Sequence, residues 1–340
     1  MKMITMFNHK GGVSKTTTTY NLGWKLASAG HKTLIVDADP QCNLTAMVLN
    51  VEDIAEFYEK NPKCDIFSCI SPVLNGNLSS LESGSPYQTI NKNLFLFCGN
   101  LDLSDAETQM SVAITTSTAI PAIKNLPGSI GELIRKTAIE NEFEYVILDL
   151  SPSIGALNQC LFMASDYFII PTSPDFFCAQ AIKSLSNIIP KWNEDINKFR
   201  DDSITYRFPN QPPKFIGFIS QRFRPRGGLP AKSFQRWIDV IRDLVNTSLI
   251  PSLNKINMSI PIDVFKTYIK GDEPFNLVNI ADFNSLIAQS QKYCIPIYAL
   301  SDDQIEQSGV ILDTMKKSRD SFDNTFTDFA QQLHNLVQNV

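Results

Sequence analysis

One segment near the N-terminus of this 340-residue chain, HKGGVSKTT at residues 9–17, is its most informative part. It follows a short apolar run, Met3 to Asn8, and precedes a helical pattern from Lys15 to Ala29. A glycine-rich turn between a strand and a helix presents free backbone N–H groups to an anion. Because Gly11 and Gly12 lack a Cβ, phosphates can approach the backbone closely there. We therefore predict a phosphate loop.

The details of this loop depart from the common pattern G-x-x-x-x-G-K-[ST]. His9 and Ser14 occupy the positions of its two glycines, and the chain has K-G-G-x-x-K-[ST] instead. Lys15 would contact the β- and γ-phosphates, and the Thr16 hydroxyl would bind Mg²⁺. The predicted phosphate-binding residues are Lys10, Gly11, Gly12, Val13, Ser14, Lys15, Thr16 and Thr17. The alternative, a glycine-rich hairpin with solvated lysines, fits poorly between a strand and a helix.

The pattern with a second lysine resembles the deviant phosphate loop of the ParA/MinD family of ATPases. The resemblance implies that ATP and Mg²⁺ are the cofactors and that two copies enclose the nucleotides in a homodimer. In that family the extra lysine, here Lys10, reaches the partner's nucleotide, where its charge acts as an arginine finger does. The resemblance gives Lys10 and Lys15 catalytic roles.

A second motif, DADPQCN at residues 37–43, ends the next strand pattern, Thr33 to Val36. It resembles the switch I signature D-x-D-P-Q-x-N of ParA proteins, which usually have glycine at the position of Cys42. The resemblance implies that Asp39 positions the attacking water and that Asp37 supports Mg²⁺, since phosphoryl transfer relies on positioning and electrostatics. The alternative is that one of these aspartates only caps the following helix.

A third motif is the apolar strand pattern Tyr145 to Leu150, which delivers Asp149 as a Walker B carboxylate for Mg²⁺. The following Ser151-Pro152-Ser153 resembles switch II of the family, although Leu150 and Ser151 replace its Thr-Pro. A looser resemblance around Met258–Pro261 suggests that Pro261 contacts the base.

Further buried strand patterns are expected at Leu94 to Cys98, Tyr167 to Pro171 and Phe215 to Ile219. Apolar strands separated by helices indicate a parallel sheet covered on both faces. The expected fold is an α/β P-loop NTPase, with a central, mostly parallel sheet flanked by helices on both faces. We predict a single domain, residues 1–340, with insertions near 51–93 and 191–213. A long helix from about Gly309 to Val337 should pack through Phe322, Phe326, Phe329, Leu333 and Leu336.

Composition limits the function classes. Hydrophobic residues make up 43% of the chain and charged residues 19%, which indicates a packed globular protein. The net charge of −5 excludes a wholesale polyanion binder but not a local basic patch. The seven cysteines include no C-x-x-C pair, which disfavours zinc and iron–sulfur sites. Without a signal peptide or an 18-residue apolar stretch, we expect a cytoplasmic protein, nucleoid-associated if it binds DNA.

Two basic groups could bind DNA nonspecifically. One comprises Arg222, Arg224, Arg226, Lys232, Arg236 and Arg242, and the other Lys316, Lys317 and Arg319. The alternative is a solvated surface. No membrane contact is expected, because the segment from Asn324 to Val340 contains Asp328 but neither lysine nor arginine.

The predicted function is an ATP-dependent dimerising switch of the ParA type, with slow ATP hydrolysis that a partner stimulates. DNA or plasmid partitioning with a ParB-like adaptor is the first hypothesis. The alternative is a nucleotide-gated scaffold or regulator of another protein complex, such as a defence, secretion or envelope system.

Overall fold

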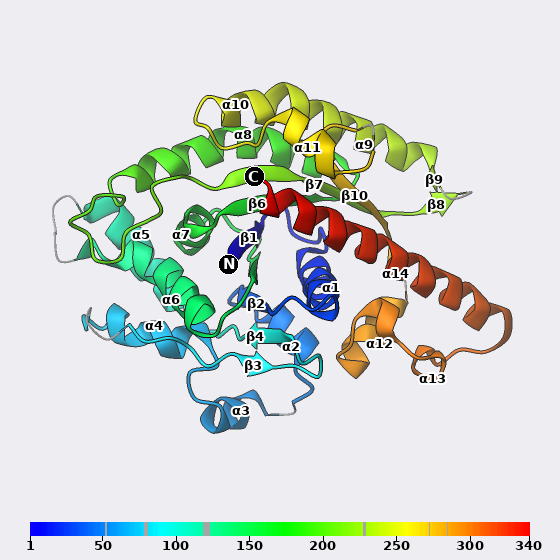
Figure 1. The fold of residues 1–340 in the computed structure, drawn as a ribbon, viewed down its shortest axis with the longest axis horizontal. Helices are drawn as coiled ribbons and strands as arrows, with labels where there is room; N and C mark the ends of the chain where they lie inside the picture. The colour runs from blue at the N-terminus through cyan, green and yellow to red at the C-terminus, as the bar shows by residue number, and fades with distance from the viewer. Residues whose placement is uncertain (52, 78–80, 118–122, 227–228, 272, 284) are drawn as a thin grey trace.

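The computed structural model describes residues 1–340 except 52, 78–80, 118–122, 227–228, 272 and 284. Its centre is an eight-stranded sheet with the strand order β10-β7-β6-β1-β5-β2-β4-β3 (Figure 1). All neighbouring strands are parallel except β3, which is antiparallel to β4. The strands are β1 (Lys2–Met6), β2 (Thr33–Ala38), β3 (Tyr87–Gln88), β4 (Leu94–Phe97), β5 (Tyr145–Leu150), β6 (Tyr167–Thr172), β7 (Lys214–Phe223) and β10 (Asn276–Ala281).

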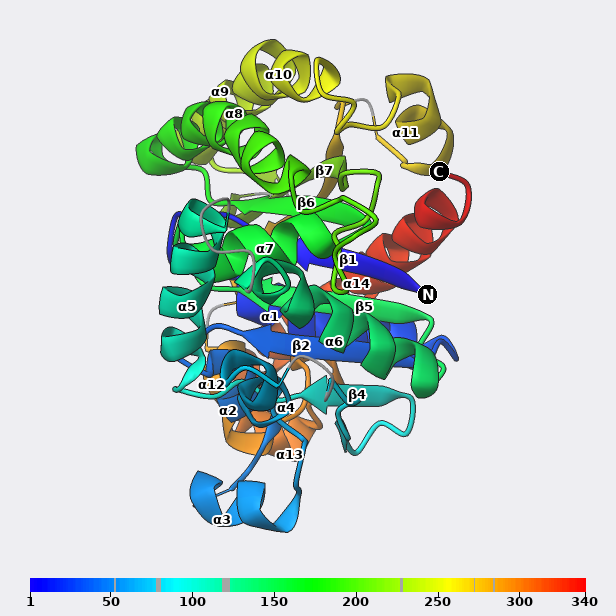
Figure 2. The same cartoon turned by 90° about the vertical axis from the view of Figure 1, so that its left-hand side faces the viewer.

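Helices cover both faces of the sheet because its central strands are apolar on both sides. Every residue of β2, β5 and β6 is buried. In Figure 1, α1 (Lys15–Ser28) and α14 (Gly309–Gln338) lie on one face of the sheet. The other face is covered by α5 (Leu103–Thr116), α6 (Leu126–Glu140) and α7 (Ala156–Ala164), with α8 (Phe176–Asn197) beyond them (Figure 2). The predicted fold class is therefore confirmed.

The remaining elements lie around this core. Between β2 and β4 the chain forms α2 (Asn43–Val48), α3 (Ile54–Lys60) and α4 (Ile66–Leu74). After β7 come the short hairpin β8 (Pro225–Arg226) and β9 (Leu229–Pro230), α9 (Lys232–Leu244), the π-helix η2 (Val245–Leu249), α10 (Ile250–Asn254) and α11 (Ile262–Tyr268). Between β10 and α14 are α12 (Leu286–Tyr293), the 3₁₀ turn η3 (Ile297–Ala299) and α13 (Asp302–Ile305). That residues 51–93 and 191–213 are insertions stays a prediction.

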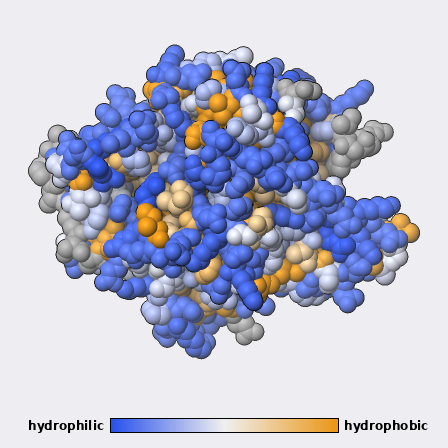
Figure 3. Space-filling view, in the orientation of Figure 1, coloured by the Kyte–Doolittle hydropathy of each residue, from blue (hydrophilic) through white to orange (hydrophobic). Residues whose placement is uncertain are grey.

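The long C-terminal helix packs on the core as expected. Its five predicted contact residues are all buried: Phe322, Phe326, Phe329, Leu333 and Leu336. The face of the molecule in Figure 3 is mainly hydrophilic, with small hydrophobic patches, one of them at the tip where α14 begins. Among the described residues, no helix is both long and apolar enough to pass through a lipid bilayer. The seven cysteines are unpaired, and five of them are buried.

Strands β3, β8, β9 and β10 were not anticipated, and β10 is the longest of them. Residues 276–281 form β10 at the edge of the sheet, although the sequence analysis passed over them. The segment around Met258–Pro261 makes only an isolated bridge, from Ser259 to Phe215 at the start of β7. The apolar run that ends at Asp282 has the same strand-then-aspartate pattern as β2 and β5 and could have revealed β10.

Candidate functional site

The predicted phosphate loop lies at the carboxyl end of β1 and leads into α1. Gly12 and Ser14 both have left-handed backbones, with φ of 71° and 56°. Glycine adopts this conformation at no steric cost, whereas other L-residues pay about 1–2 kcal/mol. This explains why phosphate loops usually have glycine at the position of Ser14. The serine keeps the geometry at an energetic cost.

The two lysines of the loop have different environments. Lys15 is buried and donates from Nζ to the Asn8 carbonyl at 3.1 Å. Burial lowers the pKa of Lys15, while the nearby carboxylates of Asp149 and Asp39 oppose that shift. Lys10 is half-buried, and its Nζ donates to the Gly11 carbonyl at 2.8 Å. Lys15 thus points into the loop, and Lys10 lies against its outer rim.

Two aspartates lie side by side behind the loop. Asp37 of β2 and Asp149 of β5 are register partners and are both buried. Neither carboxylate oxygen of Asp149 has a hydrogen-bond partner in the described part of the chain. Burial raises the pKa of Asp149 to about 7, which the neighbouring Thr16 hydroxyl and Lys15 ammonium oppose. A buried carboxyl group without partners is a strong indication of a missing ligand.

Asp37, in contrast, is already engaged by the protein. Its Oδ2 accepts hydrogen bonds from both the backbone N and the hydroxyl of Thr45, each at 2.7 Å. Burial still raises the pKa of Asp37 to about 6. These contacts hold the first turn of α2, so the helix-capping alternative describes Asp37 well. The role of Asp37 in Mg²⁺ binding stays a prediction.

Asp39 lies on the switch I segment and lines the cleft beside the phosphate loop. Its Oδ1 accepts from the backbone N of Gln41 at 2.9 Å, which leaves Oδ2 available to the cleft. Cys42 follows in a left-handed conformation, with φ of 53°. The family usually has glycine at this position, and glycine adopts a left-handed backbone without steric cost, as at the position of Ser14.

Switch II is held by two side chains that the sequence analysis did not single out. The Asn158 amide nitrogen lies 2.9–3.0 Å from carbonyl and hydroxyl oxygens of Ser151 and Ser153. Glu107 of α5 accepts from the backbone N atoms of Ala156 and Leu157 at 2.6 and 2.9 Å, which caps α7. These contacts join residues from different elements, so no local motif announces them.

A cleft of about 640 Å³ connects these elements. At one end are the phosphate loop, Asp39 and Pro152; at the other are Asp282, Phe283, Ile287 and Gln291. Pro261 does not line this cleft, so the base contact at Pro261 stays a prediction that the cleft does not support. Pro261 follows Ser259, which pairs with Phe215 at the start of β7, whereas the cleft lies at the far end of β7, beside Arg222. At about 3.3 Å per strand residue, these ends are roughly 20 Å apart.

The end of β7 supports the phosphate loop from the side. Gln221 is buried, donates to the Val13 carbonyl and accepts from the Thr18 hydroxyl at 2.7 Å. Arg222 donates to the Gly12 carbonyl and lines the cleft. Arg222 belongs to the basic group predicted to bind DNA, and it lies at the phosphate loop.

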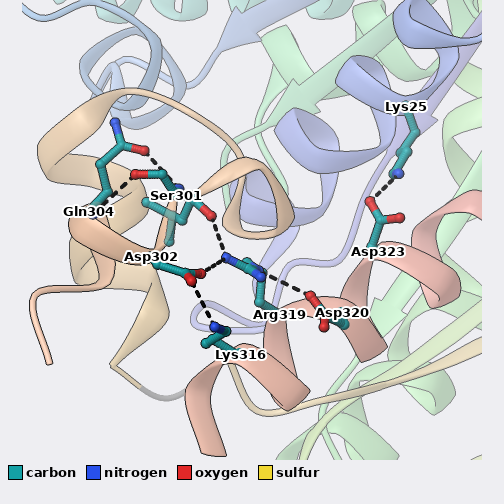
Figure 4. Close-up of polar contacts among 9 residues, drawn as sticks. Lys25, Ser301, Asp302, Gln304, Lys316, Arg319, Asp320 and Asp323 are labelled. Atoms are coloured by element: carbon teal, nitrogen blue, oxygen red, sulfur yellow. Dashed lines mark hydrogen bonds and ion pairs between the residues drawn. The ribbon is translucent and has the colours of Figure 1, made fainter. Parts of the chain in front are cut away.

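The other predicted DNA-binding residues fall into two sets. Arg242 is paired with Asp239, Asp243 and Glu273. Asp302 pairs with Lys316 at 2.7 Å and with Arg319 at 2.8 Å (Figure 4). The exposed members without an ion pair among the described residues are Arg224, Lys232, Arg236 and Lys317. The Arg226 side chain lies outside the described part.

The site fits a magnesium ion. The unpartnered Asp149 carboxylate and the half-buried Thr16 hydroxyl are neighbours, and both are hard oxygen ligands of the kind that Mg²⁺ prefers. When bound, the ion would neutralise phosphate charge. The described residues contain no group of three or more His, Cys, Asp or Glu side chains that could hold a metal ion.

Comparison with known proteins agrees with this geometry. A family model described as AAA domain matches residues 1–200, more than half of the chain. The chain is 28% identical over 196 residues to sporulation initiation inhibitor protein Soj of Bacillus subtilis, covering 58% of this chain and 68% of Soj. The chain belongs to the ParA/MinD family of P-loop ATPases.

Solved structures show the same ParA/MinD fold. A variant of Cyanothece McdA in complex with ATP has a TM-score of 0.58 and 19% identity, covering 94% of this chain and 96% of McdA. The pNOB8 ParA structure, bound to nonspecific DNA, has a TM-score of 0.59 and 18% identity and covers 99% of both chains. Both structures extend the ParA/MinD fold over nearly the whole chain, including the part beyond residue 200.

Proposed function

We propose that this chain is an ATP-dependent switch of the ParA type. Two copies bind ATP and Mg²⁺, dimerise around the nucleotides and hydrolyse ATP slowly, and the dimer binds nonspecific DNA for DNA partitioning. The observation that carries the proposal is the pairing of a two-lysine phosphate loop with the unpartnered, buried carboxylate of Asp149. Lys15, Thr16 and Asp149 hold phosphate and Mg²⁺, while Asp39 faces the cleft to orient water.

Exposed apolar side chains beside the phosphate loop support dimerisation. Phe176 and Phe177, at the start of α8, are 51% and 66% exposed, and Ile154 of switch II is 50% exposed. Cys178 follows them, close enough to Lys10 and Lys15 for their charges to act on its thiol. Burying a large apolar side chain contributes about 1.5–3 kcal/mol. A second copy that faces this surface would cover these side chains and bring its Lys10 to the nucleotide.

The dimer is tested with Asp39→Ala, which should bind ATP but hydrolyse it poorly. We expect light scattering to show the dimeric mass with ATP and Mg²⁺ and the monomeric mass with ADP. The Phe177→Ala change in the same background should shift the ATP-bound mass toward the monomer. An Asp39→Ala protein that stays monomeric with saturating ATP would refute the proposed dimer.

DNA binding is supported by the exposed basic residues near the end of β7. Phe223 and Lys317 line one groove, and the exposed Arg224 follows Phe223 in the chain. The relative pNOB8 ParA binds nonspecific DNA, as its structure shows. Dimerisation would double such a basic surface, and neutralised phosphates make binding sensitive to salt.

The test is ATP-dependent retention of random-sequence DNA. Combining Arg224→Ala with Lys317→Ala should weaken retention at least about tenfold and flatten its salt dependence, because each lost phosphate contact lowers the slope. Arg207→Ala is the matched control, since Arg207 pairs with Asp202 away from this groove. Unchanged retention in the double variant would move DNA binding to another surface.

The second candidate is a nucleotide-gated scaffold for a protein partner, and one exposed apolar turn offers a surface for such a partner. The first turn of α14 exposes Val310 and Ile311 by 81% and 60%. An adaptor protein that binds this turn would be compatible with either output. Loss of DNA retention in all conditions, with an intact ATP-driven dimer, would favour the scaffold.

A further inference from the structure

Arg222 occupies an irregular position in the sheet. Along the β7–β10 ladder, Gln221 pairs with Ile280 and Phe223 with Ala281, so Arg222 is an extra residue without a partner. It is thus the residue of a β-bulge. Bulges bend a strand locally and redirect a side chain, and they are frequent beside active sites.

The backbone of Arg222 is also strained. Its φ is 65°, a left-handed value that costs a residue other than glycine or asparagine about 1–2 kcal/mol. Unfavourable backbone geometry persists where the surrounding structure imposes it, often at ligand sites. Here Gln221 imposes it on one side through its contacts to Val13 and Thr18.

The bulge directs the guanidinium group of Arg222 onto the phosphate loop. There it donates to the Gly12 carbonyl, and a Cβ on Gly12 would lie only 3.4 Å from the Arg222 Nη1. No carboxylate of the described residues forms an ion pair with Arg222, which is exposed. A neutral carbonyl leaves most of its five N–H donors and its full charge available to an anion.

Arg222 lies between the two ends of the cleft. The next residue, Phe223, accepts a backbone hydrogen bond from Asp282 at 2.9 Å, and Asp282 belongs to the end opposite the phosphate loop. Lys15 and Thr16 line the same cleft, and Asp39 follows β2, which lies on the far side of β1 from β7; all three face the terminal phosphate in the proposed function. A nucleotide with its terminal phosphate at these residues would bring its α- and β-phosphates, which form its middle part, next to Arg222.

We propose that Arg222 binds the α- and β-phosphates of the nucleotide held by its own subunit, as a second cation of that subunit beside Lys15. This inference rests on the proposed function, because it requires a nucleotide in the cleft. A guanidinium group suits the role because it can form two parallel hydrogen bonds to phosphate oxygens. Arg222 is therefore a nucleotide-binding residue and not part of the DNA surface.

The experiment compares Arg222→Ala and Arg222→Lys with the unmodified chain by calorimetry, using ADP and the non-hydrolysable analogue AMP-PNP, each with Mg²⁺. We expect Arg222→Ala to weaken both nucleotides by at least about tenfold and by similar factors. Arg222→Lys should fall between, since it keeps the charge but loses the forked geometry. Arg207→Ala, the matched control, should bind both nucleotides normally, and circular dichroism verifies that each variant is folded.

Three results would overturn the inference: unchanged ADP affinity in Arg222→Ala, a loss confined to AMP-PNP, or a loss of DNA retention with nucleotide affinity intact. The second would place Arg222 at the γ-phosphate, and the third would return it to the DNA surface. If the unmodified chain binds neither nucleotide, the proposed function itself fails, which is a distinct outcome.

Discussion

The two ends of the central sheet differ in how completely their polar groups are paired. At the amino end, the Asp166 carboxylate accepts from the Met3 backbone N at 2.8 Å and from Arg135 at 3.2 Å. The Tyr145 hydroxyl there lies 2.6 Å from the His334 ring nitrogen. At the carboxyl end, by contrast, buried atoms of His9, Asp149, Asn158 and Ser173 have no partner in the described part of the chain.

Left-handed backbone occurs at both ends of the sheet, since Glu142 and Asn257 at the amino end have φ of 57° and 56°. Ser14, Cys42 and Arg222 all adopt left-handed conformations around the cleft. Native proteins pair nearly all their buried polar groups, so exceptions call for a ligand or a strained functional site. At the carboxyl end of the sheet, unpaired polar groups lower the stability of the fold but serve ligand binding. Packing at the amino end and along α14 stabilises the fold. The following predictions test this division of roles.

The largest effect is expected for Lys15→Ala. This change removes the buried ammonium group beside Asp149 and Asp39, and with it the main charge for the β- and γ-phosphates. We expect nucleotide binding and hydrolysis to be lost while the chain remains folded. Fluorescent-nucleotide titration measures nucleotide binding, and circular dichroism shows whether the chain remains folded. Normal turnover in this variant would refute the phosphate-loop assignment.

Lys10→Ala should separate binding from turnover. The Lys10 ammonium group donates to the Gly11 carbonyl on the rim of its own loop, so ATP affinity should change little. A cation supplied to the partner's nucleotide acts as an arginine finger does, and those contribute about 10³–10⁵ in rate. We expect kcat to fall by roughly 10³-fold in steady-state assays. Equal turnover in Lys10→Ala and the unmodified chain would exclude the proposed role of Lys10 at the partner's nucleotide.

Leu333→Ala should lower the stability of the fold and leave nucleotide binding unchanged. Leu333 is fully buried where α14 packs on the core, and such truncations cost about 2–5 kcal/mol. We expect urea unfolding to show that loss, with nucleotide affinity of the folded protein unchanged. Val310→Ala, on the exposed first turn of the same helix, serves as the control and should stay within about 0.5 kcal/mol. A tenfold loss of nucleotide affinity in Leu333→Ala would contradict the division of roles.

Ser14→Gly is expected to have the smallest effect, and a favourable one. Glycine removes the cost of the left-handed backbone at this position, so the free energy of unfolding should rise by about 1 kcal/mol. Ser14→Ala keeps that cost and should bring no gain. Thermal and urea unfolding of both variants provide the measurement. A less stable Ser14→Gly protein would show that the serine hydroxyl contributes more than the strain costs.

Much of the site was predictable because its chemistry is encoded over short stretches. The phosphate loop and Asp39 each follow a buried strand and Asp149 lies near the end of one, and parallel strands bring their carboxyl ends to one edge of the sheet. The same rule applied to the run ending at Asp282 would have identified β10. The looser family resemblance around Met258–Pro261 predicts a base contact beside the start of β7, at the opposite end of that strand from the cleft.

The sequence by itself determined the fold class, the phosphate loop and the carboxylates, because strand periodicity and glycine-rich turns act between near neighbours. Only the tertiary structure decided that Gln221 and Arg222 support the phosphate loop, more than 200 residues earlier in the chain. It also decided that Glu107 caps α7 and that Asp302 neutralises Lys316 and Arg319. Such contacts depend on which strands and helices pack side by side, and the spacing of residues along the chain carries no record of that.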